Sequence, residues 1–314
     1  MTASRLILAI EGGGTKTDAL LVSPEGQELA RARGGPGNLH SVGPVGLTRL
    51  FEELLGKLGV RLELRPGEVG VVSLAMAGVD SEAEQDAVQE AVRAAGLKAP
   101  VVVNSDARAT LLGACGPAGL LVIAGTGSIA FGRNAEGREK RAGGWGHAFG
   151  DEGSAYDLGR RALAFTCRVV DGRSHPGPLS NRVLSALGVT RGVDPRPAIL
   201  CLLGQVRTIA ALAPVVLETA LENDPVARGI VDTAARQLLD MVDAVATPLG
   251  FDDGPFTMAL HGGLLARGKF YSRRFEEMVQ LLWPQAELRH TPEDAGLRGA
   301  AELGRIFLAG GPRD

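Results

Sequence analysis

Two glycine-rich turns carry the groups best suited to hold phosphate. One spans residues 12–17 and the other spans residues 125–128, and each follows an apolar run. Glycine lets backbone N–H groups approach an anion closely, while hydroxyl and ammonium groups add further donors. Either turn alone also fits a plain hairpin, but the presence of two predicts a polyphosphate site. Its predicted residues are Gly13, Gly14, Thr15, Lys16 and Thr17, together with Gly125, Thr126, Gly127 and Ser128.

Asp106 follows an apolar strand and opens a predicted helix, in the sequence Asn104-Ser105-Asp106. Aspartate is a favoured residue at a helix N-cap, so capping is one explanation for it. Phosphoryl transfer needs a carboxylate that orients the attacking hydroxyl, so a general base is the other explanation. The residue type and its position leave both roles open.

Residues 143–154 form the most unusual segment, because five glycines surround Trp145, His147, Asp151 and Glu152. The two carboxylates could simply favour the N-terminus of the helix that follows. One helix terminus does not require so many glycines or a tryptophan, however. An aromatic face with hydrogen-bond acceptors nearby is typical of a site for a small polyhydroxylated ligand.

A second polar loop contains Asn38 and His40, in the sequence Gly35-Pro36-Gly37-Asn38-Leu39-His40. We interpret His40 and His147 as structural or substrate-positioning residues, because no cluster of other ligands surrounds either histidine at metal-binding spacing. The sequence therefore predicts no metal site built from protein side chains alone.

Small residues also stand after a later strand and at the start of the last helix. They include Gly262, Gly263 and Gly296. They could admit a flat nucleobase, or they could allow close packing of helices, and both explanations stay open. Residues 263–269 have the spacing of a Walker motif, but Phe270 replaces the Ser or Thr that would hold magnesium.

Hydrophobic patterning predicts the elements that must position these groups. In the first third, strands are expected at 6–10, 19–22, 28–33, 69–74 and 101–103. Helices are expected at about 45–58, after a capping box at Ser81 and Glu84, and over 107–114. Further on, helices are expected at 154–170, 226–245 and 295–308, and strands at 256–260 and 286–288. Strands that alternate with helices predict an α/β architecture.

The opening of the chain is repeated 111 residues later, which predicts a duplication. The matching pairs are Gly14/Gly125, Thr15/Thr126, Ala19/Ala130, Glu25/Glu136, Gly26/Gly137 and Glu28/Glu139. The expected fold is two related α/β lobes, with helical insertions in the second lobe and a ligand cleft between them at the carboxyl ends of the strands. The predicted domains are 1–114 with a C-terminal helix at 296–314, and 115–295.

Composition excludes several classes of protein. The 314 residues carry 33 basic and 36 acidic side chains, for a net charge of −3, so no basic field indicates binding to nucleic acid. The three cysteines are isolated, which argues against a disulfide framework or a zinc cluster. The first apolar run is too short for a signal core or a membrane span. We expect a soluble, cytoplasmic protein that binds no membrane.

Taken together, these motifs resemble the N-acetylglucosamine kinase branch of the BadF/BadG/BcrA/BcrD ATPase family, within the sugar kinase, Hsp70 and actin superfamily. The resemblance rests on EGGGTKT at 11–17, Asn38, SDA at 105–107, AGTGS at 124–128 and GGWGHAFGDEGSAY at 143–156. It implies two ribonuclease-H-like lobes that close over ATP and a sugar. It also implies transfer of phosphate to the 6-hydroxyl of an amino sugar.

The resemblance further assigns roles to single residues. Asp106 would be the general base, and the two glycine turns would be the phosphate motifs. The sugar would be contacted by Asn38, Trp145, Gly146 and Asp151. Gly262, Gly263 and Gly296 would form the adenosine motif. Mg²⁺ would be held mainly by nucleotide phosphates and water, and the enzyme would be a homodimer.

The substrate expected first is N-acetylglucosamine. Glucosamine, N-acetylmuramic acid and a broad range of hexoses remain as alternatives, because sugar selectivity can depend on one pocket contact. Two functions of other classes are also open: an ATPase switch or activator without a sugar substrate, and a sugar sensor without catalysis.

Overall fold

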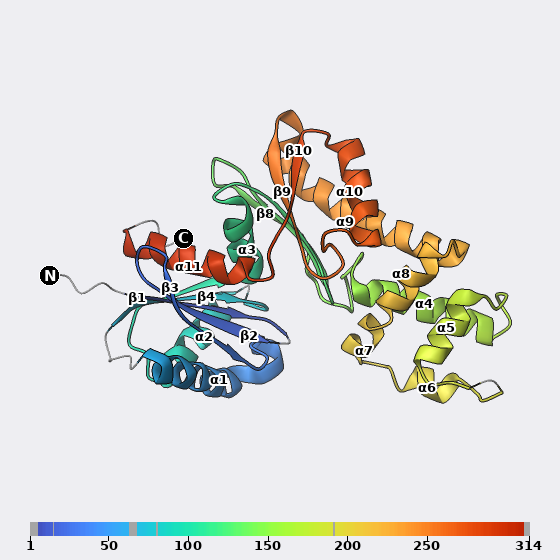
Figure 1. Cartoon of the computed structure of the whole chain (residues 1–314), viewed down its shortest axis with the longest axis horizontal. Coiled ribbons are helices and arrows are strands. Elements are labelled where there is room, and N and C mark those ends of the chain that lie inside the picture. The colour runs from blue at the N-terminus through green and yellow to red at the C-terminus, as the bar shows by residue number, and fades with distance from the viewer. Residues whose placement is uncertain (1–5, 15, 63–67, 80, 191, 311–314) are drawn as a thin grey trace. The chain divides into compact units, whose positions relative to one another are not determined.

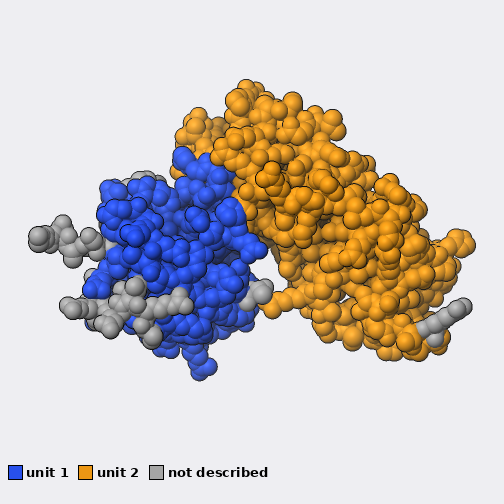
Figure 2. Space-filling model, viewed as in Figure 1, with its two compact units in different colours: residues 1–117, 292–314 blue, residues 118–291 orange. Residues whose placement is uncertain are grey.

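The computed structural model describes residues 6–14, 16–62, 68–79, 81–190 and 192–310 (Figure 1). The chain divides into two compact units (Figure 2). The first unit contains residues 1–117 and 292–314, and the second contains residues 118–291. Within the described part of the chain, no helix has the length and apolar character needed to cross a membrane.

The first unit is built on a five-stranded mixed sheet with the order β3-β2-β1-β4-β5. Its strands are β1 (Leu6–Gly12), β2 (Thr17–Val22), β3 (Glu28–Gly34), β4 (Val69–Met76) and β5 (Val101–Ser105). The first three strands form an antiparallel meander, and β4 and β5 then run parallel to β1. The carboxyl ends of β1, β4 and β5 therefore meet at one edge.

Alternating side chains cover both faces of this sheet with helices. Leu8 and Ile10 pack with α1 (Leu39–Leu62) and α2 (Glu82–Ala94), while Ile7 and Ala9 pack against α3 (Asp106–Cys115) and α11 (Ala295–Leu308). Figure 1 shows the two pairs of helices on opposite sides of the sheet. The capping box predicted at Ser81 and Glu84 is confirmed at the start of α2.

The second unit repeats this topology with a sheet of order β10-β9-β6-β7-β8. Its strands are β6 (Gly119–Ala124), β7 (Ser128–Arg133), β8 (Glu139–Gly143), β9 (Phe256–His261) and β10 (Ala286–His290). The second and third strands of the two units start 111 residues apart, at 17 and 128 and at 28 and 139. The predicted α/β duplication is therefore confirmed.

The two glycine turns differ by one residue in length. In the first unit Gly12 pairs with Thr17, which leaves residues 13–16 in the turn. In the second unit Ala124 pairs with Ser128, which leaves only residues 125–127. The offset of 111 therefore becomes 112 for the strands that lead into the turns.

Helical insertions in the second unit are also confirmed. Between β8 and β9 lie α4 (Ala155–Val170), α5 (Pro178–Ala186), α6 (Arg196–Leu200), α7 (Val206–Ala210), α8 (Ala213–Leu221) and α9 (Pro225–Leu249). A 3₁₀ turn, η1 (Phe251–Asp253), precedes β9, and α10 (Phe270–Leu282) joins β9 to β10. Sequence patterning predicted α4 and α9 but missed α5 to α8 and α10.

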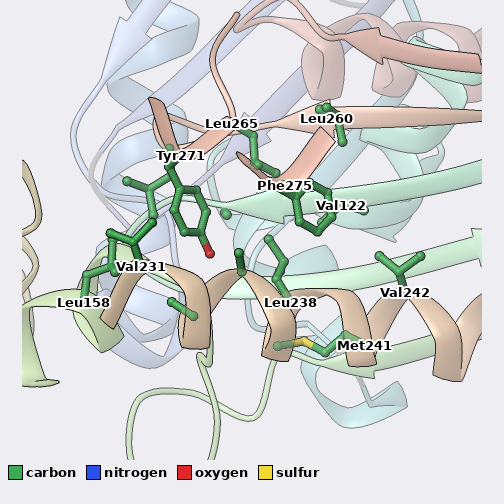
Figure 3. Close-up of a cluster of buried hydrophobic side chains, with 14 of the residues drawn as sticks. Val122, Leu158, Val231, Leu238, Met241, Val242, Leu260, Leu265, Tyr271 and Phe275 are labelled. Atoms are coloured by element: carbon green, nitrogen blue, oxygen red, sulfur yellow. The ribbon is translucent and has the colours of Figure 1, made fainter. Parts of the chain in front are cut away.

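The core of the second unit forms where α9 and α10 meet the sheet (Figure 3). Leu238 and Val242 of α9 belong to one buried cluster with Val122 of β6 and Leu260 of β9. Tyr271 is fully buried in the same cluster, and its ring extends from α10 with the hydroxyl directed toward α9 (Figure 3). This core therefore joins the inserted helices to the repeated sheet.

Close packing of α3 on α11 depends on glycine. A Cβ atom on Gly299 would overlap the backbone carbonyl of Ala109, and one on Gly113 would overlap the carbonyl of Ala295. The two backbones approach so closely that no larger residue fits without movement. At these positions the small residues serve helix packing.

We expect Gly299→Ala to lower the free energy of unfolding by ~1–3 kcal/mol, because the added methyl group must push the two helices apart. Urea unfolding measures this change. The matched control is Gly56→Ala on α1, where nothing lies within 4 Å of the new methyl group. That variant should gain about 0.5–1 kcal/mol, since alanine favours a helix. Equal losses in both variants would contradict the close-packing explanation.

Candidate functional site

The first glycine turn lies at the carboxyl edge of the first sheet. The backbone N–H of Gly13 donates to Lys16 O (3.0 Å), which closes the turn, and no atom lies within 4 Å of a Cβ built on Gly14. Thr15, one of the predicted phosphate contacts, lies outside the described residues. The outer side of this turn has room for a ligand to approach the backbone.

Thr17 and Ser128 occupy equivalent places in the two units and make equivalent hydrogen bonds. The buried Thr17 hydroxyl donates to Gly35 O (2.8 Å), and the buried Ser128 hydroxyl donates to Glu152 O (2.6 Å). Each bond ties the segment after the third strand back to the start of the second strand. Their hydroxyl protons therefore serve the fold, whereas Thr126 is exposed on the second turn.

Asp18 holds two cations beside the first turn. Its carboxylate lies 3.3 Å from Lys16 Nζ and 2.6 Å from Arg33 Nε, and the residue is only 7% exposed. Burial alone would raise the pKa of Asp18, but Arg33 and Lys16 outweigh burial and lower that pKa. Lys16, which was predicted to bind phosphate, is thus anchored at the turn by a carboxylate that the sequence did not single out.

Glu11 is a second carboxylate missed by sequence reasoning. It precedes the first turn at the end of β1, and a Cβ on Gly296 would overlap its carboxylate. Burial raises the pKa of Glu11 to about 7, with further contributions from the charges of Asp106 and Asp18. Lys16 and the backbone N–H of Leu297 oppose this shift without cancelling it. Carboxylates thus gather at this edge closely enough to repel one another.

Asp106 is the first residue of α3, and the N-cap is its neighbour Ser105. The Ser105 hydroxyl accepts a hydrogen bond from Arg108 N (3.2 Å), while Asp106 Oδ1 accepts one from Ala107 N (2.8 Å). The N-cap is therefore Ser105 and not Asp106, although the Asp106 carboxylate also accepts one N–H of the first turn. Its half-buried carboxylate lies at the same sheet edge as the first turn, because Met76 pairs with both Gly12 and Ser105.

Asn38 is held at this edge by hydrogen bonds to two neighbouring segments. Its Nδ2 donates to Ala77 O (3.1 Å), just after β4, and its Oδ1 accepts from Ser41 N (3.2 Å) in the first turn of α1. A Cβ on Gly78 would lie 2.9 Å from Asn38 Nδ2, so the amide is closely packed. The first unit therefore gathers Asn38, Asp106 and the first turn at one end of its sheet.

In the second unit, Gly262 lies against the strand that leads into the second turn. Its φ is +96°, and an added Cβ would lie 2.5 Å from Ala124 O, so glycine is required here. Leu264 N donates to the same carbonyl (3.1 Å), and Gly263 has open space around its Cα. Gly296, by contrast, belongs to the first unit beside Glu11.

Asp151 is closely associated with the second turn. Its Oδ1 accepts a hydrogen bond from Ser128 N (3.1 Å), and a Cβ on Gly127 would lie 2.6 Å from the same oxygen. Burial raises the pKa of Asp151, and the Ser128 N–H and His147 offset part of this rise. The N-cap of α4 is Ser154, so capping does not explain Asp151 or Glu152 either.

The loop before Asp151 presents aromatic side chains at the surface. Trp145 is 69% exposed, with the guanidinium of Arg141 5.5 Å from its ring centre, and Phe149 is 87% exposed. Gly146 adopts φ +76° with open space around it. Large exposed apolar groups in an otherwise glycine-rich loop are typical of a binding surface.

The described residues contain no group of three or more His, Cys, Asp or Glu side chains arranged to hold a metal ion. Mg²⁺ bound to a nucleotide does not need such a cage, because one or two carboxylates and the phosphates suffice. Glu11, with its raised pKa, lies where a cation would relieve carboxylate repulsion. The first unit therefore fits a nucleotide-bound Mg²⁺ at this edge.

The chain matches the BadF/BadG/BcrA/BcrD ATPase family over residues 8–304. It belongs to this family. The match spans both units and includes every predicted site residue. Because the family is an ATPase family, the chain is a nucleotide-using protein.

Two relatives named as kinases are similar to this chain over almost their whole length. An N-acetylmuramic acid/N-acetylglucosamine kinase of Clostridium acetobutylicum is 30% identical over 306 residues, covering 96% of this chain and 98% of the relative. An N-acetyl-D-glucosamine kinase of Dictyostelium discoideum is 30% identical over 319 residues, with the same coverage. A Chromobacterium violaceum structure, provisionally described as an N-acetylglucosamine kinase, has a TM-score of 0.77 and 27% identity, covering 96% of this chain and 99% of that chain.

We expect the metal-free protein to lose stability as pH rises through the titration range of Glu11. Its folded pKa of about 7 lies above the ordinary value of 4.5, so the native state binds the proton more tightly than the unfolded state. The unfolding free energy should therefore fall by ~3 kcal/mol between these two pH values. Urea unfolding across this range, with a chelator present, measures the decrease.

Glu11→Gln is the control for this pH dependence. It removes the titrating group, so the difference between wild type and variant isolates Glu11 from Asp151, which titrates in both proteins. Asp18, whose pKa is lowered, affects stability only at a pH below this range, where protonation of its carboxylate removes its stabilising contribution. Parallel curves for the two proteins would show that Glu11 does not titrate in this range.

Proposed function

We propose that this protein is an ATP-dependent kinase that transfers the γ-phosphate to the 6-hydroxyl of an amino sugar, with N-acetylglucosamine as the first candidate. The observation that carries the proposal is the position of Asp106. Its carboxylate lies at the edge of the first sheet with the first glycine turn, on a helix that Ser105 already caps. The named activities of the two 30% identical relatives support the same reaction.

Asp106 has the chemistry that the proposed reaction requires. A carboxylate next to the sugar hydroxyl orients it and accepts its proton as the oxygen attacks phosphorus. The glycine turns, with Lys16 and Thr126, provide backbone and side-chain donors for phosphate oxygens. Mg²⁺ would neutralise developing charge on the phosphates, and Glu11, near the end of β1 before the first turn, would support it.

We propose that four residues bind the sugar. Asn38 supplies an amide, Asp151 supplies a buried carboxylate, and Trp145 and Gly146 supply an aromatic surface and accessible backbone. Gly262, Gly263 and Gly296 are proposed to border the adenosine. We further propose that the two compact units are the two domains of the enzyme, and that it acts as a cytoplasmic homodimer.

N-acetylmuramic acid is the alternative substrate with a specific observation in its favour. The Clostridium acetobutylicum relative is named for both sugars. A test with purified enzyme, ATP and Mg²⁺ compares N-acetylglucosamine, N-acetylmuramic acid, glucosamine and glucose by ADP release. We expect ADP release that depends on an amino sugar. ATP hydrolysis that no sugar changes would instead indicate a switch, and sugar binding without ADP would indicate a sensor.

Asp106→Asn tests the proposed general base. We expect kcat to fall by about 10²–10⁴-fold, which corresponds to roughly 3–5 kcal/mol of transition-state stabilisation. ATP binding, measured by calorimetry, should be retained because the amide keeps the size of the side chain. The control is Asp86→Asn, an exposed carboxylate on α2. A near-normal kcat for Asp106→Asn would remove Asp106 from this role.

A further inference from the structure

Two buried side chains from different helices bind the backbone of Gly153. Tyr271 of α10 donates its hydroxyl hydrogen bond to Gly153 O (2.8 Å), and Asp157 of α4 accepts one from Gly153 N (3.2 Å). Tyr271 is fully buried, and Asp157 is 2% exposed. Both polar groups of this peptide segment are therefore satisfied by side chains rather than by a helix or strand.

Gly153 also has no space for a side chain. Its φ is +77°, and an added Cβ would lie 2.8 Å from Ala234 O and 2.9 Å from Leu238 Cβ, both on α9. The backbone of Gly153 is thus pressed against α9 while α4 and α10 hold it by hydrogen bonds. Its position is set by the core shown in Figure 3.

The residues immediately before Gly153 are held by Ser128, at the start of β7. Ser128 donates its hydroxyl to Glu152 O (2.6 Å) and its backbone N–H to Asp151 Oδ1 (3.1 Å). Asp151 adopts φ +62°, in the left-handed region that non-glycine residues rarely occupy. Such a conformation is unfavourable for a residue with a side chain and persists only where neighbouring contacts enforce it.

The two side chains that bind Gly153 are themselves fixed. Asp157 lies 2.9 Å from both Arg160 Nη2 and Arg161 Nε, and Arg161 Nη2 donates to Gln237 Oε1 (2.6 Å) on α9. Burial, and then the charge of Asp157, raises the pKa of Tyr271 well above its usual range, so the phenol remains a donor. A phenylalanine would fill this core equally well, but it could not bind Gly153.

We propose that Tyr271 and Asp157 are positioning residues, which hold Asp151 in its left-handed conformation so that its carboxylate can bind the sugar. This inference rests on the proposed function, in which Asp151 contacts the sugar. Neither side chain touches the substrate in this role. Both act through Gly153, and they link α4 and α10 to sugar affinity.

The test is Tyr271→Phe, which removes the donor to Gly153 and keeps the aromatic ring. We expect the KM for the sugar to rise about 10-fold, in line with the loss of one buried hydrogen bond, while the KM for ATP stays within about 2-fold. Hydrogen exchange followed by mass spectrometry should show faster exchange in peptides that span residues 144–156.

The matched control is Phe275→Leu, one turn further along α10 and fully buried in the same core. This variant destabilises the core without removing a partner of Gly153, so the sugar KM and the exchange of residues 144–156 should remain those of the wild type. A sugar KM for Tyr271→Phe that matches either the wild type or Phe275→Leu would overturn the inference.

The exchange measurement separates this inference from the proposed function. A wild-type protein that phosphorylates no sugar contradicts the proposed function, whatever the variants do. Unchanged exchange at residues 144–156 in Tyr271→Phe contradicts the positioning role even when the wild type is an active kinase.

Discussion

One hydrogen bond, made twice, ties the segments that carry Asn38 and Asp151 to the two glycine turns. Thr17 and Ser128 each donate a buried hydroxyl to a carbonyl in the segment that follows the third strand of their unit. In the first unit that segment leads directly to Asn38, and in the second it contains Asp151. Each proposed sugar contact is thereby brought to the glycine turn of its own sheet. The duplication thus repeats this hydrogen bond as well as the fold.

Three carboxylates lie near one another at the edge of the first sheet, close enough for the charges of Asp106 and Asp18 to raise the pKa of Glu11. Asp18 is paired with Lys16 and Arg33, but the pKa of Glu11 rises to about 7 next to Asp106 and Asp18. Repulsion between carboxylates lowers the stability of the ligand-free protein. The same repulsion favours binding of a cation or a proton at this edge. This repulsion would be relieved in the proposed reaction, in which Mg²⁺ arrives with the nucleotide and a carboxylate accepts a proton.

The sequence predicted the repeated sheet well, because strand patterning and the 111-residue offset report on local structure. It missed α5 to α8, which are at most nine residues long and lack a complete apolar stripe. It passed over Glu11 because its pKa is raised first by burial in the folded unit and then by the charge of Asp106, nearly a hundred residues away. It also could not show that the N-caps of α3 and α4 are Ser105 and Ser154 rather than the neighbouring aspartates.

The placement of α11 has a consequence for biosynthesis. The first unit contains residues 1–117, yet α11, which covers Ile7 and Ala9 on one face of its sheet, begins only at residue 295. While a ribosome is still making the second unit, that face has only α3 to cover it, and the apolar side chains that α11 will cover are exposed to water. The nascent sheet would therefore be a natural substrate for chaperones that shield exposed hydrophobic surface, until the last helix emerges and closes it.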